Sequence, residues 1–259
     1  MKRGYQYIFG PVSSWRLGSS LGIDLLSQDR KICNFDCLYC QLGGTHAPTK
    51  ERRLYIPTDH ALAEVGGLPA DVAIDTITFS GMGEPTLALN LGETILAVKA
   101  IRREPVAVLT NASLMGRDGV REELSYADIV VAKMDVCSQV FLQRVNRPAP
   151  EIAFDDIVDG LKKFRASYGG KLVLQIMFIR ENQGIAAGIA KIAEEICPDE
   201  IQINTPLRPC QESPLPPESV GEIVRFFRAF RTRSVYECER PSVLSLSPEE
   251  TLRRRGKVI

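Results

Sequence analysis

Long apolar runs and an excess of charge of either sign are both missing from this chain of 259 residues. No apolar run approaches the ~20 residues needed to span a bilayer. The first residues, MKRGYQYIFGPVSSW, lack the continuous apolar stretch of a signal peptide. Both absences predict a cytoplasmic protein with no membrane partner. Thirty-two basic residues balance 32 acidic ones, so charge gives no support for nucleic acid as a partner, which stays open only through a local basic patch.

Histidine is scarce, and internal repeats, low-complexity tracts and linkers are absent from the sequence. Neither His46 nor His60 continues a standard zinc-ligand spacing. A hydrophobic fraction of 44% is ordinary for a soluble globular protein, and the length is sufficient to bury one substantial core. We therefore expect a single domain over residues 1–259. It ends in a short charged tail, SPEETLRRRGKVI, whose arginine run we expect to be a solvated surface.

Short β-branched runs alternate with amphipathic stretches along the chain. Near-continuous apolar strands that alternate with helices predict an α/β fold with a parallel sheet. In barrels of this construction the chemistry lies at the carboxyl ends of the strands. The pattern predicts strands over 21–26, 73–80, 105–110, 128–135, 171–178 and 199–205, and helices over 59–67, 89–103, 117–126, 154–167, 185–196 and near 217–231.

Three of the seven cysteines crowd into one short segment directly after the first predicted strand. Cys33, Cys37 and Cys40 have the spacing C-x3-C-x2-C, so three thiolates can converge from one loop. A structural zinc site needs a fourth protein ligand, which neither histidine supplies at a standard spacing. Soft thiolates favour an iron-sulfur cluster, and three cysteines leave one iron open to an external ligand. The loop therefore predicts a cluster, with zinc or plain packing as the alternatives.

The same spacing, with the aromatic Tyr39 before the last cysteine, resembles the defining loop of the radical S-adenosylmethionine (SAM) superfamily. The resemblance implies a partial (β/α)6 TIM-like barrel, one [4Fe-4S] cluster on the three cysteines, and SAM chelated by the open iron through its amino and carboxylate groups. It also implies a low-potential electron donor of the flavodoxin or ferredoxin type. Reductive cleavage of SAM would give methionine and a 5′-deoxyadenosyl radical, which abstracts hydrogen from a substrate.

A second match, FSGMGEP, follows the second predicted strand and is similar to the superfamily's Gly-Gly-Glu motif. Gly81 and Gly83 allow the backbone to approach a ligand closely, and Glu84 is a candidate acceptor for the ammonium of SAM. Read by itself, the segment is more typical of a glycine turn followed by a helix start. Beside the cysteine loop, we interpret it as part of the SAM site.

Further polar residues end the later predicted strands. Asn111 lies in the segment Thr-Asn-Ala, where other members of the superfamily often have Thr-Asn-Gly. Asp135 lies where those members often place a polar contact to the SAM ribose. Turn and cap roles are the alternative for both, because Asn and Asp often satisfy backbone groups at strand ends. Gln175, Met177 and Asn204 are candidates for lining the same pocket, although a methionine in an apolar strand is more often core.

Within the superfamily, the chain resembles a subgroup related to wyosine-base synthases, which modify a tRNA guanosine. The segments GPVSSWRLGSSLGIDLL, FLQRVNRPAP, KLVLQIMF and IQINTPLRP carry this resemblance. Those synthases have further cluster cysteines upstream of the loop, whereas no cysteine precedes Cys33 here, so wyosine synthesis itself is not expected. Three arginines in predicted loops are candidates for binding a carboxylate or phosphate: Arg144, Arg147 and Arg208. A separate basic loop, formed by Lys50, Arg52 and Arg53, is expected to be exposed.

Several functions remain open from the sequence. A radical SAM enzyme could act on RNA, on a peptide or protein, or on a small metabolite, and the motifs do not choose among these substrates. The alternatives are a non-enzymatic [4Fe-4S] redox or electron-transfer protein, a tRNA-modifying wyosine-type enzyme and a zinc-stabilised RNA-binding module. Cys137, Cys210 and Cys238 could share the active face and hold a second cluster, but their wide spacing leads us to expect about four irons per chain.

Overall fold

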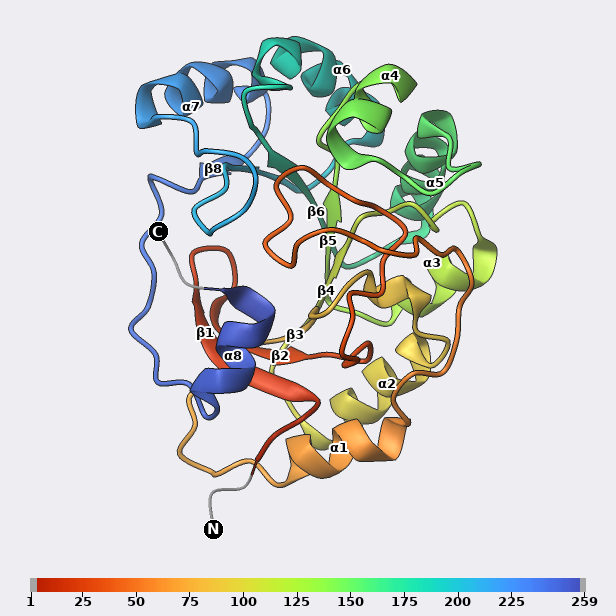
Figure 1. Cartoon of the computed structure of the whole chain (residues 1–259), viewed down its shortest axis with the longest axis vertical. Helices are drawn as coiled ribbons and strands as arrows, with labels where there is room; N and C mark the ends of the chain where they lie inside the picture. Colours follow the sequence, from red (N-terminus) through yellow and green to blue (C-terminus); the bar gives the residue numbers. More distant parts are fainter. Residues whose placement is uncertain (1–3, 257–259) are drawn as a thin grey trace.

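One eight-stranded sheet forms the centre of the protein in the computed structural model, which describes residues 4–256. The strands pair in chain order, from β1 to β8. The pair β1 and β2 is antiparallel, and every pair from β2 to β8 is parallel. Figure 1 shows the sheet curled into a partial barrel with helices on its outer side. The strands are β1 (Ile8–Ser14), β2 (Gly18–Ile23), β3 (Thr76–Phe79), β4 (Val106–Thr110), β5 (Ile129–Lys133), β6 (Lys171–Met177), β7 (Glu200–Asn204) and β8 (Thr232–Ser234).

Helices cover the outer face because each parallel pair needs a crossover connection. Their apolar sides pack on the strands, so the strands read as continuous apolar runs instead of alternating ones. Helix α4 has three residues and leads into the π-helix η2 (Leu142–Asn146). The α-helices are α1 (Thr58–Gly66), α2 (Leu91–Ile101), α3 (Asp118–Ser125), α4 (Gln139–Phe141), α5 (Phe154–Ser167), α6 (Ala186–Ile196), α7 (Pro217–Val224) and α8 (Pro248–Arg255).

The six predicted strands correspond to β2 to β7, and their ends agree within three residues. Strand β1 was not predicted, because the Gly-Pro pair in its sequence IFGPVSS argues against a strand. It tolerates Pro11 because it is an edge strand, with an irregular register between Phe9 and Val12. The helix expected near 217–231 is shorter than predicted: α7 ends at Val224 and continues as a 3-10 turn to Phe227.

The C-terminal segment forms helix α8, which packs against β1 (Figure 1). The expectation of a solvated arginine run is wrong for Arg254, which is only 1% exposed. Its guanidinium donates to Asp24 Oδ2 (2.7 Å) and to the backbone oxygen of Gln6. A buried charge needs such partners, and they come from the N-terminal half of the chain.

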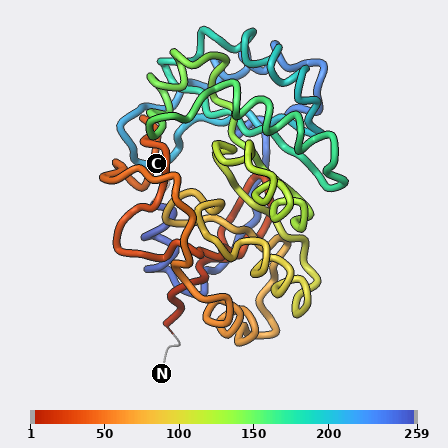
Figure 2. The backbone as a smooth tube through the Cα atoms, turned by 90° about the vertical axis from the view of Figure 1, so that its right-hand side faces the viewer, coloured from red at the N-terminus to blue at the C-terminus, as the bar shows by residue number. Residues whose placement is uncertain are grey.

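A long connection of residues 24–57 joins β2 to α1 and carries the three clustered cysteines. Figure 2 shows this red-orange segment along one side of the molecule. The connection begins at the carboxyl end of β2, where the other crossovers also leave the parallel sheet. None of the helices in residues 4–256 is long and apolar enough to cross a membrane.

Candidate active site

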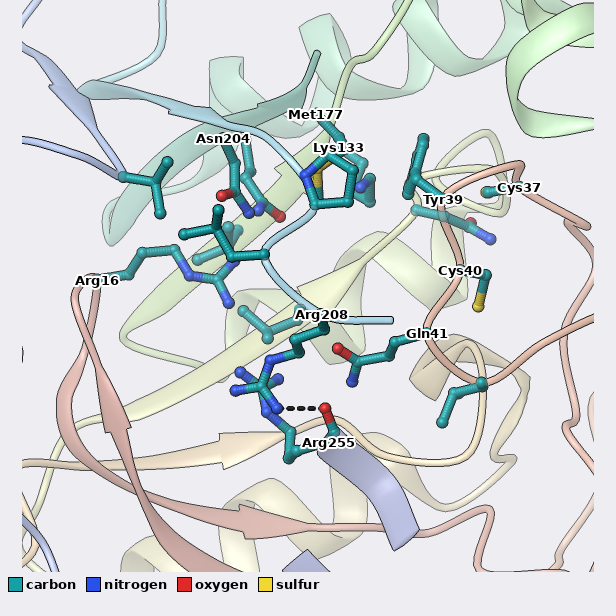
Figure 3. A pocket seen from close by; sticks show the side chains of 18 of the residues that line it. Arg16, Cys37, Tyr39, Cys40, Gln41, Lys133, Met177, Asn204, Arg208 and Arg255 are labelled. Atoms are coloured by element: carbon teal, nitrogen blue, oxygen red, sulfur yellow. Dashed lines mark hydrogen bonds between the residues drawn. The ribbon is translucent and has the colours of Figure 1, made fainter. Parts of the chain in front are cut away.

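A cavity of about 280 Å³ opens inside the curled sheet and collects most of the residues predicted from the sequence. All three clustered cysteines line it, as do Met177 and six of the eight residues assigned to SAM: Tyr39, Gly83, Glu84, Asn111, Gln175 and Asn204. Figure 3 shows Cys37, Cys40 and Tyr39 on one side of this pocket and Asn204 with Arg16 on another. The two remaining residues, Gly81 and Asp135, are not among the residues that line the pocket.

The glycine motif holds one side of the cysteine loop. Ile32 N donates to Met82 O (2.8 Å), and Glu84 N donates to Ile32 O (3.0 Å), so the two loops pair like short strands. Gly83 has φ of +155°, and a Cβ built there would lie 1.6 Å from Ile32 O. Only glycine allows this close approach. The motif therefore supports the cysteine loop directly, a role that the sequence did not suggest.

The π-helix η2 holds the other side of the cysteine loop. Asp36 N donates to Asn146 O and Leu38 N to Val145 O, each at 3.0 Å. The buried Asn146 amide donates to Cys37 Sγ (3.5 Å) and to Tyr39 Oη (2.9 Å). Sequence reasoning noticed the segment FLQRVNRPAP only as a resemblance and missed this contact. In the sequence, no local signal marks a polar residue of this segment as a thiol partner.

The cysteine thiols are free, since none of the three forms a disulfide. Phe35 N donates to Cys33 Sγ (3.4 Å). Burial, together with nearby Cys37 and Glu84, raises the pKa of the Cys33 thiol to about 12. No three His, Cys, Asp or Glu side chains in residues 4–256 converge on a position for a single metal ion. A [4Fe-4S] cluster binds each cysteine to a different iron, and the free thiols around one pocket fit that requirement.

Among residues 4–256, Glu84 is the only acidic residue that lines the pocket. Its Oε1 accepts hydrogen bonds from Thr86 N, Thr86 Oγ1 and Thr110 Oγ1, and its Oε2 accepts one from Asn111 N (2.6 Å). Burial raises the pKa of Glu84, while these hydrogen bonds act in the opposite direction. Oε1 is saturated, whereas Oε2 keeps a free acceptor position.

Asp135 and Gly81 support the site from behind. Asp135 is 3% exposed, accepts hydrogen bonds from Tyr39 Oη and Asn146 Nδ2, and accepts one from Met177 N at 2.7 Å. It thus links the cysteine loop to strands β5 and β6. Gly81 leaves room for Asp24, because an added Cβ would lie 2.2 Å from that side chain's Cγ. Both residues stay predictions as direct SAM contacts.

The remaining cysteines are dispersed. Cys137 lies against Gly188 of α6, and Cys238 Sγ accepts a hydrogen bond from Arg233 Nε (3.3 Å). Cys210 lines a smaller cavity beside Cys37 and Cys40, and its thiol donates to the backbone oxygen of Glu212. This separation agrees with one cluster per chain, which stays a prediction.

The arginines singled out from the sequence divide into two groups. Arg144 pairs with Glu181 (3.8 Å) and Arg147 with Asp36 (4.0 Å), whereas Arg208 lines the pocket. The expected exposed loop is wrong for Arg52, whose side chain is 12% exposed and pairs with Glu123. Three further arginines line the pocket and were not predicted as site residues: Arg16, Arg240 and Arg255.

Comparisons with known proteins agree with this geometry. Residues 30–186 match the radical SAM superfamily. A UPF0026 protein of Synechocystis sp. is 40% identical over 210 residues, which are 81% of this chain and 78% of that protein. A UPF0026 protein of Methanocaldococcus jannaschii is 36% identical over 228 residues, which are 86% and 70% of the two chains.

Among solved structures, TYW1 with a lysine-pyruvate adduct bound has a TM-score of 0.63 and 13% identity, covering 82% of this chain and 74% of that one. At this identity the likeness concerns the fold, and it confirms the predicted partial barrel. The family match extends over more than half of the residues. The chain therefore belongs to the radical SAM superfamily and is a radical SAM enzyme.

Proposed function

We propose that Cys33, Cys37 and Cys40 hold one [4Fe-4S] cluster and that SAM binds beside it in the same pocket. The observation that carries this proposal is that the three free thiols and Glu84 line one cavity, joined through the Ile32–Gly83 pairing. When bound, the reduced cluster supplies the electron that cleaves SAM to methionine and a 5′-deoxyadenosyl radical. A low-potential donor of the flavodoxin or ferredoxin type is the partner that this chemistry requires.

The protein's own residues have three tasks in this proposal. The hydrogen bonds from Phe35 N and Asn146 Nδ2 to cysteine sulfurs help to set the potential of a bound cluster. Glu84 Oε2 accepts a hydrogen bond from the SAM ammonium at its free acceptor position. Asp135 is a positioning residue, because it orients Tyr39 and Asn146 around the cysteine loop.

Polar groups deeper in the pocket are assigned to the rest of SAM. Asn111 donates to Asn34 Oδ1 (2.7 Å) and is held at the carboxyl end of β4 by its backbone bond to Glu84. Gln175 lines the cavity from β6 and Asn204 from β7. Amide side chains offer both donors and acceptors, which suits the hydroxyl groups and ring nitrogens of an adenosine.

The test is anaerobic reconstitution of the full chain with iron and sulfide, followed by SAM and dithionite. We expect 5′-deoxyadenosine, measured by chromatography and mass spectrometry. Cys37→Ala should lose both the cluster and the product. Cys197→Ser is the matched control, because Cys197 is exposed and remote in sequence from the loop, and it should retain both. A sample with a full cluster that neither binds nor cleaves SAM would favour the electron-transfer alternative and contradict the proposal.

A further inference from the structure

The pocket has a strongly unbalanced charge although the whole chain is neutral. Its lining contains two lysines, four arginines and a single carboxylate, that of Glu84. The lysines belong to the cysteine side: Lys133 Nζ lies 4.3 Å from the centre of the Tyr39 ring, and Lys31, two residues before Cys33, donates to Gly43 O (3.0 Å). The arginines line the rest of the cavity and are Arg16, Arg208, Arg240 and Arg255.

These four arginines come from distant parts of the chain. Arg16 lies in the turn between β1 and β2, Arg208 follows β7, Arg240 follows β8 and Arg255 ends α8. In Figure 3 the side chains of Arg16, Arg208 and Arg255 lie across the pocket from Cys37 and Cys40. Arg208 Nη1 donates to the backbone oxygens of Arg255 and Gly256, which connects two of the four.

Within the described part of the chain, no acidic side chain neutralises this group. Among residues 4–256, none of the four has an Asp or Glu oxygen within 4.0 Å, although many other arginines do. Burial, together with the charges of Arg208 and Arg240, lowers the pKa of Arg16 to about 10. Burial likewise lowers the pKa of Arg255 well below its usual value. Four like charges thus face one cavity at an electrostatic cost that a bound anion would remove.

Two buried donors in this group have no hydrogen-bond acceptor among residues 4–256. The Nε–H groups of Arg16 and Arg255 are buried and unpartnered within the described part of the chain. The neighbouring Arg254 is different, because its Nε donates to Asp24 Oδ2 at 2.7 Å. An unsatisfied buried donor costs about 1–3 kcal/mol, and such groups are rare in folded proteins. Both unpartnered groups belong to residues that line the same pocket.

We infer that Arg16, Arg208, Arg240 and Arg255 bind a phosphate group of the substrate, so that the enzyme acts on a small phosphate ester. A phosphate has enough oxygens and charge for several guanidinium groups, whereas one arginine suffices for a carboxylate. The inference rests on the proposed function in one respect: SAM would occupy the cysteine side, where the cluster would hold its carboxylate. A nucleic acid fits less well, because the arginines line a cavity and the whole chain has no net charge.

Isothermal titration of the reconstituted protein, loaded with saturating SAM, tests this inference. The probes are inorganic phosphate, AMP and GMP, with adenosine and guanosine as matched controls that lack the phosphate. We expect the phosphate-bearing probes to bind and the nucleosides to bind at least about tenfold more weakly, since they lose charge-assisted hydrogen bonds. Absence of phosphate binding would overturn the inference, because the arginines would then bind no phosphate. Abolition of phosphate binding by SAM would also overturn it, because the arginines would then bind SAM itself.

Variants identify the arginines as the site. The double substitution R16Q/R255Q should weaken phosphate binding by about tenfold or more. The exposed Arg240 offers a second variant, R240Q, that threatens the fold less and should weaken binding in the same direction. R253Q is the control, because Arg253 lies on the same helix outside the pocket lining. Unchanged phosphate affinity in both R16Q/R255Q and R240Q would reject the assignment.

Two further outcomes separate related hypotheses. Tight RNA binding would replace the small ester with a nucleic acid if the logarithm of the binding constant falls with the logarithm of salt concentration with a slope of several units. A single phosphate contact gives a slope of only about 0.7 to 0.9 in magnitude. The proposed function is tested separately, through 5′-deoxyadenosine formed by the wild-type protein without any phosphate ester. If that product is absent while the arginines still bind phosphate, the anion site stands and the radical chemistry does not.

Discussion

Arg254 Nε donates a 2.7 Å hydrogen bond to Asp24 Oδ2, joining the last helix to the residue that follows β2. Both side chains are buried, at 1% and 2% exposure. The same guanidinium also donates to Ser27 Oγ (2.6 Å) and pairs with Glu250. Because Arg254 is turned into the protein, α8 is held against β1 and the next residue, Arg255, reaches the pocket.

Loss of the Arg254 guanidinium should therefore destabilise the protein. Arg254→Met leaves the buried Asp24 carboxylate without its partner, which costs about 3–5 kcal/mol. Chemical denaturation of the full chain measures the free energy of unfolding. Arg253→Met is the control, since the Arg253 side chain is 37% exposed and its change should stay within about 0.5 kcal/mol. Equal stabilities of the two variants would show that the pair does not anchor α8.

Gly83→Ala should prevent formation of the iron site. The added Cβ would lie 1.6 Å from Ile32 O, so the pairing that supports the cysteine loop must open. We expect the variant to lose most of the iron that wild-type protein retains after reconstitution, measured by an iron assay and by absorbance. Gly119→Ala, within α3 and with open space around it, is the matched control and should keep its iron. Full iron in Gly83→Ala would show that the loop forms without this close contact.

Glu84→Gln should weaken SAM binding without removing the cluster. The amide removes the charge that attracts the SAM ammonium, a loss of about 1.5–3 kcal/mol in binding free energy. It keeps the shape of the side chain and an oxygen for the hydrogen bonds that Glu84 accepts from Thr86 and Thr110. Equilibrium titration with SAM gives the affinity, and iron content reports on the cluster. An unchanged SAM affinity would contradict the role assigned to Glu84 in binding the SAM ammonium.

Iron content should be about four per chain, and a Cys33/Cys37/Cys40 triple alanine variant should retain essentially none. The reason is that Cys137, Cys210 and Cys238 have separate surroundings. A Cys137→Ser/Cys238→Ser double variant is the control and should keep the wild-type iron content. Retention of about four irons by the triple alanine variant, and their loss on changing Cys210, would reveal a second cluster.

Glu200 should make stability depend on pH. Burial acts to raise the pKa of Glu200, but the hydrogen bonds from Lys171 (2.8 Å) and Gln202 (2.7 Å) outweigh it and the pKa is lowered. A lowered pKa contributes stability above the unfolded value of about 4.3, and this contribution is lost as the pH falls through the folded value. The difference in melting temperature between wild type and Glu200→Gln should shrink as pH falls from 7. A constant difference would mean that Glu200 is not charged in the fold.

Much of the site could be predicted because its signals are local. The spacing of Cys33, Cys37 and Cys40 and the motif around Glu84 are each complete within a few residues. The alternation of apolar strands with helices placed both motifs at carboxyl ends of parallel strands, where the pocket is found. Parallel topology brings such ends together whatever the loops contain, so the sequence determined the chemistry and the sheet edge that bears it.

Only the tertiary structure decided which residues surround that chemistry. Nothing near Arg16 or Arg255 in the sequence distinguishes a pocket arginine from a surface one, and the adjacent Arg253, Arg254 and Arg255 have three different environments. Asn146 likewise becomes a thiol partner only when η2 pairs with the cysteine loop. These contacts join segments that lie far apart in the sequence. They depend on how the sheet curls and where α8 docks, and these are properties of long-range packing that no local pattern encodes.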